Sequence, residues 1–218
     1  MVEELIATGN ADCKSIYGLE KYLTNKKHLF VSSVESVNVV SQTDLEKISH
    51  LKTPNQVVGI FSKINTRALK DPSDKITLVL DDINDPGNMG TIIRIADWFG
   101  IKDIVCSLRT VDVYNSKVVQ SSMASLARVN VVYCDLIEFF DKHKDVPIIA
   151  TTLDGESVFK QSLNSGFLVI GNEANGIREE IISRSSKRIS IPRVGKAESL
   201  NAAVATGILL GSLLKSQL

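Results

Sequence analysis

The carboxyl-terminal part of the sequence joins a short β-branched strand to a long apolar helix through a polar turn. This segment covers residues 189–210 and turns at Pro192 and Gly195. Ser199 and Asn201 lie close to the expected helix start. The first turn of a helix leaves backbone amides unpaired, and with a hydroxyl and a carboxamide beside them these amides could bind a polar ligand. The alternative is structural: Ser199 is an N-cap, and Asn201 only sits in the first turn.

A second polar segment, residues 81–100, also places a helix after a Pro-Gly turn. Its glycines have the spacing G-x-x-G, which differs from the G-x-G-x-x-G of dinucleotide-binding loops. On a helical wheel Arg94 and Trp98 share one face, four residues apart. An exposed tryptophan beside an arginine indicates a binding partner, unless Arg94 only forms an ion pair with Asp97. The residues expected on the buried face of this helix are Ile92, Ile95, Ala96 and Phe99.

The third polar segment is Gly171–Arg178, which follows an apolar strand. Its two glycines have the spacing of a P-loop, but Ile177 and Arg178 stand where a P-loop has Lys and Ser or Thr. An ATP site is therefore not expected. What remains is a tight turn that exposes backbone groups around Glu173. This carboxylate has a functional role, accepts hydrogen bonds from the amides of its own loop, or does both.

The apolar helix of the tail carries a ridge of small residues. Ala203, Gly207 and Gly211 follow one another at i, i+4 spacing and therefore lie on one side of the helix. Such a ridge allows another helix to approach closely, either within the chain or in a second subunit.

These segments need strands and helices to hold them, and the sequence from Ile76 onward alternates between the two. The expected strands are Ile76–Leu80, Asp103–Cys106, Val129–Tyr133, Pro147–Thr151, Phe167–Ile170 and Arg188–Ile191. This pattern predicts an α/β domain with a mainly parallel sheet and helices on both faces. Ligands of such sheets bind beyond the carboxyl ends of the strands, where the polar segments lie.

The first 70 residues do not continue this regular alternation of strands and helices. Short β-rich runs at Leu29–Ser32 and Val57–Phe61 flank an expected helix at Thr43–His50. A polar, proline-containing stretch follows at 68–75. We therefore expect a small amino-terminal domain at 1–70, a linker at 71–75 and a larger domain at 76–218.

Composition limits the classes of protein to consider. The chain has 218 residues, 44% of them hydrophobic, and a formal net charge of zero, so a nucleic-acid partner would have to bind local basic patches. The best patch consists of Arg184, Lys187, Arg188, Arg193 and Lys196, although such runs are more often solvated faces. The three cysteines and three histidines have no metal-ligand spacing, so neither a metal site nor a disulfide framework is expected. The amino terminus lacks the pattern of a signal peptide, and no apolar run is long enough for a membrane span, which favours a cytoplasmic protein.

Taken together, the three polar segments resemble the signature motifs of the SpoU, or TrmH-like, family of RNA ribose 2′-O-methyltransferases in the SPOUT superfamily. Asn88-x-Gly-x-x-x-Arg94 is similar to the first motif and Ile170-Gly-Asn-Glu-Ala-Asn-Gly-Ile177 to the second. The third corresponds to Ile191-Pro-x-x-Gly-x-x-x-Ser-Leu-Asn201. The resemblance covers about 76–218. It implies a carboxyl-terminal deep trefoil knot, an exception to the rule against knots, and S-adenosylmethionine as the methyl donor.

The resemblance also implies residue roles. Arg94 would activate the ribose 2′-hydroxyl or accept its proton; because arginine has a reference pKa of about 12.5–13.8, it is a poor base and could instead hold phosphate and polarise the hydroxyl. The residues that would position the ribose, a phosphate or Arg94 are Asn88, Glu173, Ser199 and Asn201. The cofactor would be read by backbone groups near Gly171, Ile191 and Leu200, with Thr151 to Leu153 as weaker candidates. Neither transfer of a methyl group nor removal of a proton requires a metal.

The family resemblance extends to partners. Sites of this family are completed across a two-fold axis, which implies a homodimer buried through the first-motif helix and the tail helix. Residues 29–62 look like the carboxyl half of the ribosomal-protein-like RNA-binding domain of many members, so we expect an amino-terminally incomplete domain that binds ribosomal or transfer RNA. Two other classes remain: an inactive RNA-binding protein of the same fold and a nicotinamide-dependent α/β enzyme, which rests on fold analogy alone.

Overall fold

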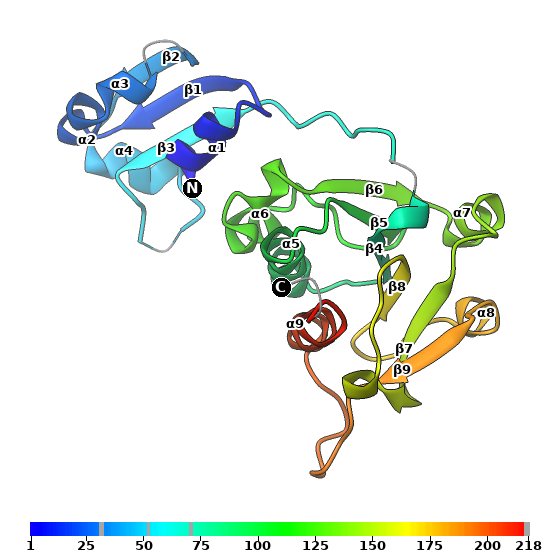
Figure 1. Ribbon diagram of the computed structural model, residues 1–218. Helices are drawn as coiled ribbons and strands as arrows, with labels where there is room; N and C mark the ends of the chain where they lie inside the picture. Colours follow the sequence, from blue (N-terminus) through cyan, green and yellow to red (C-terminus); the bar gives the residue numbers. More distant parts are fainter. Residues whose placement is uncertain (31–32, 52, 70–71, 216–218) are drawn as a thin grey trace. The chain divides into compact units, whose positions relative to one another are not determined.

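The computed structural model describes residues 1–30, 33–51, 53–69 and 72–215. The chain divides into two compact units, Met1–Asn65 and Thr66–Leu218 (Figure 1). Each unit has its own sheet.

The amino-terminal unit is built on a three-stranded sheet of order β2-β1-β3. The central strand β1 (Cys13–Gly18) pairs in parallel with β2 (Val34–Val39) and antiparallel with β3 (Val57–Phe61). Four helices accompany it: α1 (Val2–Thr8), α2 (Glu20–Asn25), α3 (Lys27–Phe30) and α4 (Gln42–Ile48). The buried hydrophobic residues of this unit include the cluster Cys13, Ile16, Leu23 and Phe30, and also Leu5 and Leu45.

Two predicted elements of this unit are confirmed and one is wrong. Helix α4 occupies the expected place and begins with a capping box between Ser41 and Asp44, and β3 has the predicted bounds. The run at Leu29–Ser32 is not a strand in its described part, because Leu29 and Phe30 end helix α3. Phe30 is buried there, with the centre of its ring 6.4 Å from that of Tyr22. The apolar residues of this run therefore form the buried side of a helix. Val31 and Ser32 lie outside the described residues.

The carboxyl-terminal unit has a six-stranded sheet of order β6-β5-β4-β8-β7-β9 in which all neighbouring strands run parallel. The predicted α/β class, parallel sheet and six strands are confirmed. The strands are β4 (Ile76–Asp81), β5 (Asp103–Ser107), β6 (Asn130–Cys134), β7 (Ile148–Ser157), β8 (Gly166–Gly171) and β9 (Lys187–Ser190). Strand β4 is buried along its whole length, as its mainly apolar sequence predicts for a strand covered on both faces.

Helices cover both faces of this sheet. Figure 1 shows α5 (Pro86–Trp98), α6 (Ser116–Ser122) and α9 (Ala202–Leu213) on one face. On the other face, α7 (Leu136–Lys142) and α8 (Glu179–Ile182) pack on Val79, Val105 and Val169. The 3-10 turns lie at Pro72–Asp74, Ser125–Ala127 and Val158–Lys160. No helix of the described ranges combines the length and apolar character of a membrane span.

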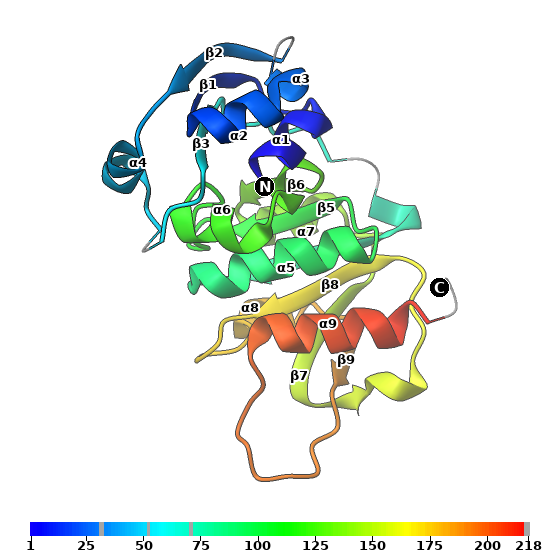
Figure 2. The ribbon, with the colours of Figure 1, turned by 90° about the vertical axis from the view of Figure 1, so that its left-hand side faces the viewer.

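The small-residue ridge of α9 contacts α5, so the described structure uses it for internal packing (Figure 2). A methyl group on Gly207 would lie 3.7 Å from Ile95 Cδ1, and one on Gly211 would lie 3.6 Å from Phe99 Cζ. Although they contact α9, Ile95 and Phe99 are only half-buried, whereas Ile93, which lies outside the predicted inner face, is fully buried. The predicted inner face of α5 was too narrow because this helix packs on α6 and α9 as well as on the sheet.

Candidate functional site

Three polar side chains from distant parts of the sequence meet beyond the carboxyl ends of β4 and β8. Asn88 Nδ2 donates a hydrogen bond of 2.8 Å to Glu173 Oε1, across 85 residues of sequence. Asn201 Nδ2 donates one of 2.7 Å to Asn88 Oδ1, across 113 residues. Each of the three sequence motifs thus supplies one member of a single chain of hydrogen bonds.

Asn88 is the central member, and the start of α5 fixes it. Asp85 is the N-cap and accepts a 2.8 Å hydrogen bond from the backbone N–H of Asn88, while Pro86 occupies the first helical turn. Asn88 is only 9% exposed. Its carboxamide has one donor group and one acceptor, and both are engaged by motif residues.

Asn201 has two roles at once, since it is also the N-cap of α9. Its Oδ1 accepts hydrogen bonds from the backbone N–H groups of Ala203 (3.0 Å) and Val204 (3.2 Å), which leaves Nδ2 for Asn88. The expectation that Ser199 caps this helix was wrong, because the helix begins two residues later. Ser199 is exposed and lies outside the chain of hydrogen bonds.

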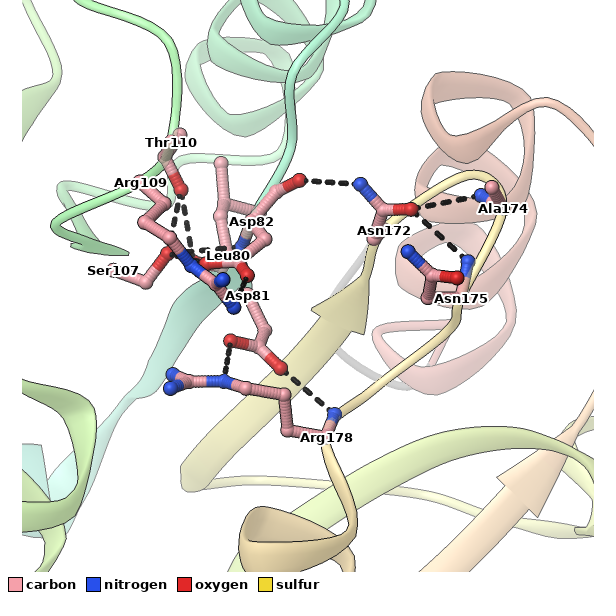
Figure 3. Close-up of polar contacts among 10 residues, drawn as sticks. All are labelled: Leu80, Asp81, Asp82, Ser107, Arg109, Thr110, Asn172, Ala174, Asn175 and Arg178. Atoms are coloured by element: carbon pink, nitrogen blue, oxygen red, sulfur yellow. Dashed lines mark hydrogen bonds and ion pairs between the residues drawn. The ribbon is translucent and has the colours of Figure 1, made fainter.

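The Gly171–Arg178 loop holds its own shape through Asn172 (Figure 3). Asn172 Oδ1 accepts hydrogen bonds from the backbone N–H groups of Ala174 (2.9 Å) and Asn175 (3.0 Å). The backbones of Asn172 and Gly176 exchange two further bonds of 3.0 Å. Asn172, and not Glu173, is therefore the acceptor for the loop amides, and the exposed Glu173 is left to reach Asn88.

Gly171 marks a close approach inside this loop. A Cβ atom at this position would lie 2.3 Å from the backbone carbon of Gly176 and 2.4 Å from the nitrogen of Ile177. Only glycine fits there, so the requirement comes from the loop itself. In the sheet, Gly171 is the register partner of Asp81, so the loops that follow β8 and β4 start side by side.

Sequence inspection missed a set of residues that anchors this loop to the end of β4. Asp81 accepts hydrogen bonds from the backbone N–H and from Nε of Arg178, and the backbone carbonyl of Asp82 accepts one from Asn172 (Figure 3). Asp82 adopts a left-handed conformation with φ +59°, which aspartate tolerates better than most residues. Its carboxylate accepts hydrogen bonds from Ser107 and Arg109. The available signal was two consecutive carboxylates directly after an apolar strand.

Arg94 and Trp98 lie on the exposed side of α5, as predicted, and Trp98 is 85% exposed. The proposed ion pair between Arg94 and Asp97 is wrong, because Asp97 pairs with Arg128 at 2.7 Å. Within the described ranges Arg94 makes no hydrogen bond or ion pair.

The cofactor candidates belong to three neighbouring strands. Gly171 ends β8, Ile191 follows β9, and Thr151 and Leu153 lie in β7. Between β7 and β9 the register shifts after Thr151, so the intervening residues 152–155 leave the ladder. Leu153 is 79% exposed there, and Leu200, in the chain segment after β9, is 49% exposed. The hydroxyl of Thr151 is already bonded to the carbonyl of Val169 at 2.8 Å.

A half-buried tyrosine, Tyr133, braces the loop next to the first motif. Tyr133 donates a 2.7 Å hydrogen bond to the carbonyl of Val111 and accepts one of 2.8 Å from the N–H of Val113. Val111 in turn bonds the carbonyl of Ile83, in the loop that leads to Asn88. Burial raises the pKa of Tyr133 well above its usual range, so its hydroxyl stays protonated as a structural donor.

Burial raises the pKa of the Cys106 thiol in the same way. The described residues contain no cluster of three or more His, Cys, Asp or Glu side chains that could hold a metal ion.

Comparison with known proteins gives relatives that match most of the chain. A 23S rRNA (guanosine(2553)-2′-O)-methyltransferase, RlmP, of Bacillus subtilis is 29% identical over 181 residues, which are 79% of this chain and 70% of the relative. The structure of a putative RNA methyltransferase of the TrmH family from Porphyromonas gingivalis is 32% identical, with a TM-score of 0.79, and the match covers 96% of this chain and 86% of that one. An AdoMet-bound rRNA methyltransferase from Sinorhizobium meliloti is 26% identical, with a TM-score of 0.86, over 99% of this chain and 85% of that one.

The family comparison agrees with the geometry. The model of the SpoU rRNA Methylase family matches residues 75–211, which include all three motifs and the Asn88, Glu173 and Asn201 side chains that they bring together. The protein belongs to the SpoU rRNA methylase family.

Proposed function

We propose that this protein transfers a methyl group from S-adenosylmethionine to a ribose 2′-hydroxyl in structured RNA. The family and the named activities of its relatives support this reaction. The observation that carries it is the hydrogen-bonded chain Glu173–Asn88–Asn201, which joins the three motifs at the carboxyl ends of the strands. Ribosomal or transfer RNA as the substrate also makes the cytoplasm the expected compartment.

The candidate cofactor residues fit S-adenosylmethionine. Leu153 and Leu200 expose apolar side chains that can cover an adenine ring, and the backbone around Gly171 and Ile191 can supply neutral donors and acceptors for its edge. The Thr151 hydroxyl is engaged within the sheet, so we assign this residue a backbone role. When bound, the cofactor supplies an electrophilic methyl group on a sulfonium centre.

The polar residues would align the ribose and handle its proton. In an in-line displacement, the 2′-oxygen must be held opposite the leaving sulfur. Asn88, Glu173 and Asn201 form a preformed polar surface for that purpose, and the exposed Ser199 is close enough in sequence to join them. Arg94 has a free guanidinium, which would bind a phosphate, polarise the hydroxyl and assist loss of its proton.

We also propose that the site is completed in a homodimer. Arg94 and the 85% exposed Trp98 extend from the same face of α5, and neither is covered within the described chain. A second subunit over α5 and α9 would bring Arg94 to its site. Sedimentation at micromolar concentration is expected to show a dimer, and a monomer would contradict this part of the proposal.

Two further expectations concern the fold and the amino-terminal unit. We propose that the segment between β9 and α9 is threaded as a deep trefoil knot, because the chain leaves the sheet at its edge strand and returns to pack α9 on α5. We propose that the amino-terminal domain, which we placed at 1–70 before a 71–75 linker and a 76–218 catalytic domain, recognises the RNA. Its separate sheet and core support an independent binding module.

A methyl-transfer assay tests the main proposal. Labelled S-adenosylmethionine and bulk RNA are expected to yield label in ribose 2′-O-methyl groups. Arg94→Ala should lower the rate about 100-fold or more, in the range of general acid-base and electrostatic contributions, while calorimetry shows unchanged cofactor binding. Lys142→Ala is the matched control, because Lys142 is an exposed cation of the same unit that forms a surface ion pair with Glu138, of 3.8 Å, on helix α7. RNA binding without methyl transfer would instead indicate an inactive RNA-binding protein.

A further inference from the structure

An ion pair between a buried aspartate and a half-buried arginine lies next to the candidate site and contributes no atom to its chain of hydrogen bonds. The carboxylate of Asp81 is fully buried and accepts two hydrogen bonds from Arg178, one of 2.9 Å from the backbone N–H and one of 2.8 Å from Nε (Figure 3). Removing one partner of such a pair leaves a buried charge without compensation. The pair is therefore a strong constraint on the position of Arg178.

The other end of the same loop is held by the next residue of the same strand. Asn172 Nδ2 donates a 2.7 Å hydrogen bond to the carbonyl of Asp82. Consecutive residues at the end of β4 thus hold the first and last polar residues of the loop. Between these two anchors lies Glu173.

The chain segment that anchors the Gly171–Arg178 loop also leads to Asn88, the hydrogen-bond partner of Glu173. Asp81 and Asp82 continue directly into the turn that starts α5 and carries Asn88. Asn88 Nδ2 then meets Glu173 Oε1 at 2.8 Å. The end of β4 therefore sets both sides of the Glu173–Asn88 contact. The left-handed conformation of Asp82, braced by Ser107 and Arg109, keeps its carbonyl directed at Asn172.

We infer that Asp81 is a positioning residue for methyl transfer: through Arg178, and together with Asn172, it sets the Glu173 carboxylate against Asn88. The inference rests on the proposed function, because it concerns the same site. A displacement of about 1 Å in a positioned group can cost about 100-fold in rate, so a residue that touches no substrate can still control turnover.

A double-mutant cycle tests whether Asp81 acts through Glu173. Asp81→Asn, which keeps the shape of the side chain, is expected to lower kcat about 10- to 100-fold. Glu173→Ala should cost at least as much, and the double variant should be no slower than Glu173→Ala alone, because residues that act as a unit are not additive. If the two losses multiply, or if Asp81→Asn leaves kcat unchanged, the inference is wrong.

Further variants separate positioning from general destabilisation. Arg178→Lys keeps the charge and should retain more activity than Arg178→Ala, while Asp141→Asn, an exposed carboxylate on α7, should match the parent. The Kd of S-adenosylmethionine and the midpoint of thermal unfolding are measured for each variant. Turnover is expected to fall in Asp81→Asn and Arg178→Ala while the Kd stays within about twofold, since the cofactor contact proposed in this loop is the backbone of Gly171, which the β4–β8 ladder holds independently of Arg178.

Hydrogen exchange provides a readout that does not depend on turnover. In Asp81→Asn, amides of the 172–178 peptide should exchange at least about tenfold faster, whereas the 130–134 peptide of β6 should be unchanged. Unchanged protection of the 172–178 peptide would overturn the inference even if the protein proved inactive on RNA. If the 172–178 peptide loses protection in Asp81→Asn but the parent protein methylates no RNA, the proposed function is wrong and the anchoring role of Asp81 stands.

Discussion

The two loops that follow β8 and β9 both carry motif residues, yet the rest of the chain holds them very differently. The Gly171–Arg178 loop is fixed by side chains at each end, by the Asn172–Gly176 bridge within it and by the close packing of Gly171. Its Glu173 is already bonded to Asn88. This loop is preorganised without any ligand.

The loop between Pro192 and Leu200 lacks such anchors. Every residue in it is exposed, and Val194 has full solvent exposure. Among the described residues, its polar contact is a 3.2 Å hydrogen bond from Arg193 Nη1 to the carbonyl of Ala197. The next fixed point is Asn201, which is the N-cap of α9 and also donates a hydrogen bond to Asn88.

The difference leads us to propose different tasks for the two loops. Preorganised groups stabilise a transition state because they need no rearrangement during the reaction. An exposed segment with apolar side chains such as Val194 and Leu200 has surface to offer to a ligand or a second subunit. We therefore propose that Glu173 of the Gly171–Arg178 loop faces the reacting ribose, and that the Pro192–Leu200 loop serves the cofactor, together with the Gly171 backbone, and the second subunit.

Adding one methyl group to each loop should give the largest contrast. Gly171→Ala places a Cβ 2.3 Å from the backbone of Gly176, so the loop has to shift, and overpacking of this kind costs about 1–3 kcal/mol. Because Glu173 moves with the loop, methyl transfer should fall about 100-fold. Denaturant unfolding and the labelled-donor assay measure the two effects.

Gly195→Ala is the matched change in the exposed loop. A Cβ at Gly195 has no atom within 4 Å, so the free energy of unfolding should change by no more than about 0.5 kcal/mol. Equal destabilisation by the two alanines would refute the contrast between the loops.

The residue where the exposed loop ends should show the next largest effect. Asn201→Asp keeps the acceptor for the amides of Ala203 and Val204 but removes the donor to Asn88. Stability should stay within about 0.5 kcal/mol of the parent, because aspartate is an equally good N-cap, while activity falls about tenfold or more. Asn201→Ala should lose similar activity and also about 1 kcal/mol of stability. If Asn201→Asp retained full activity, Asn201 would be only a cap.

Limited proteolysis compares the loops directly in the unmodified protein. Trypsin should cut after Arg193 or Lys196 before it cuts after Arg178, because cleavage needs locally open chain. Saturating S-adenosylmethionine should slow the cuts in the exposed loop about tenfold or more, as binding favours the closed form by mass action. First cleavage after Arg178, or no protection by the cofactor, would contradict the assigned tasks.

The sequence predicted those parts of the fold and site that depend on local patterns. Apolar runs separated by helices predicted the six strands, and the rule that ligands bind at the carboxyl ends of parallel strands placed Asn88, Glu173 and Asn201 in one region. The separate amino-terminal sheet left a weaker signal: its central strand β1 was not anticipated, because Cys13–Gly18 contains lysine, serine and glycine.

What could not be predicted depends on contacts between distant residues. Asp97 has Arg94 as its obvious partner within one turn of helix, yet it binds Arg128 from another element. Ser199 and Asn201 are both residue types favoured at N-caps, and Asn201 takes this position in the structure, where it also bonds to the distant Asn88. The Asp81–Arg178 pair spans 97 residues, and no local pattern reveals it.

The smallest effect is expected on α9, beyond the exposed loop, where the glycines face α5 at ordinary contact distance. Cβ atoms at Gly207 and Gly211 would lie 3.7 and 3.6 Å from their nearest neighbours, so alanine fits without displacement. Since alanine is favoured over glycine in a helix interior by about 0.8–1.0 kcal/mol, Gly207→Ala should stabilise the fold slightly, by up to that amount, and leave methyl transfer within twofold. Urea unfolding and the methyl-transfer assay give both values. Destabilisation above about 1 kcal/mol would mean that α5 and α9 lie closer together than the distances to Ile95 and Phe99 indicate, and that the α9 glycines are as constrained as Gly171.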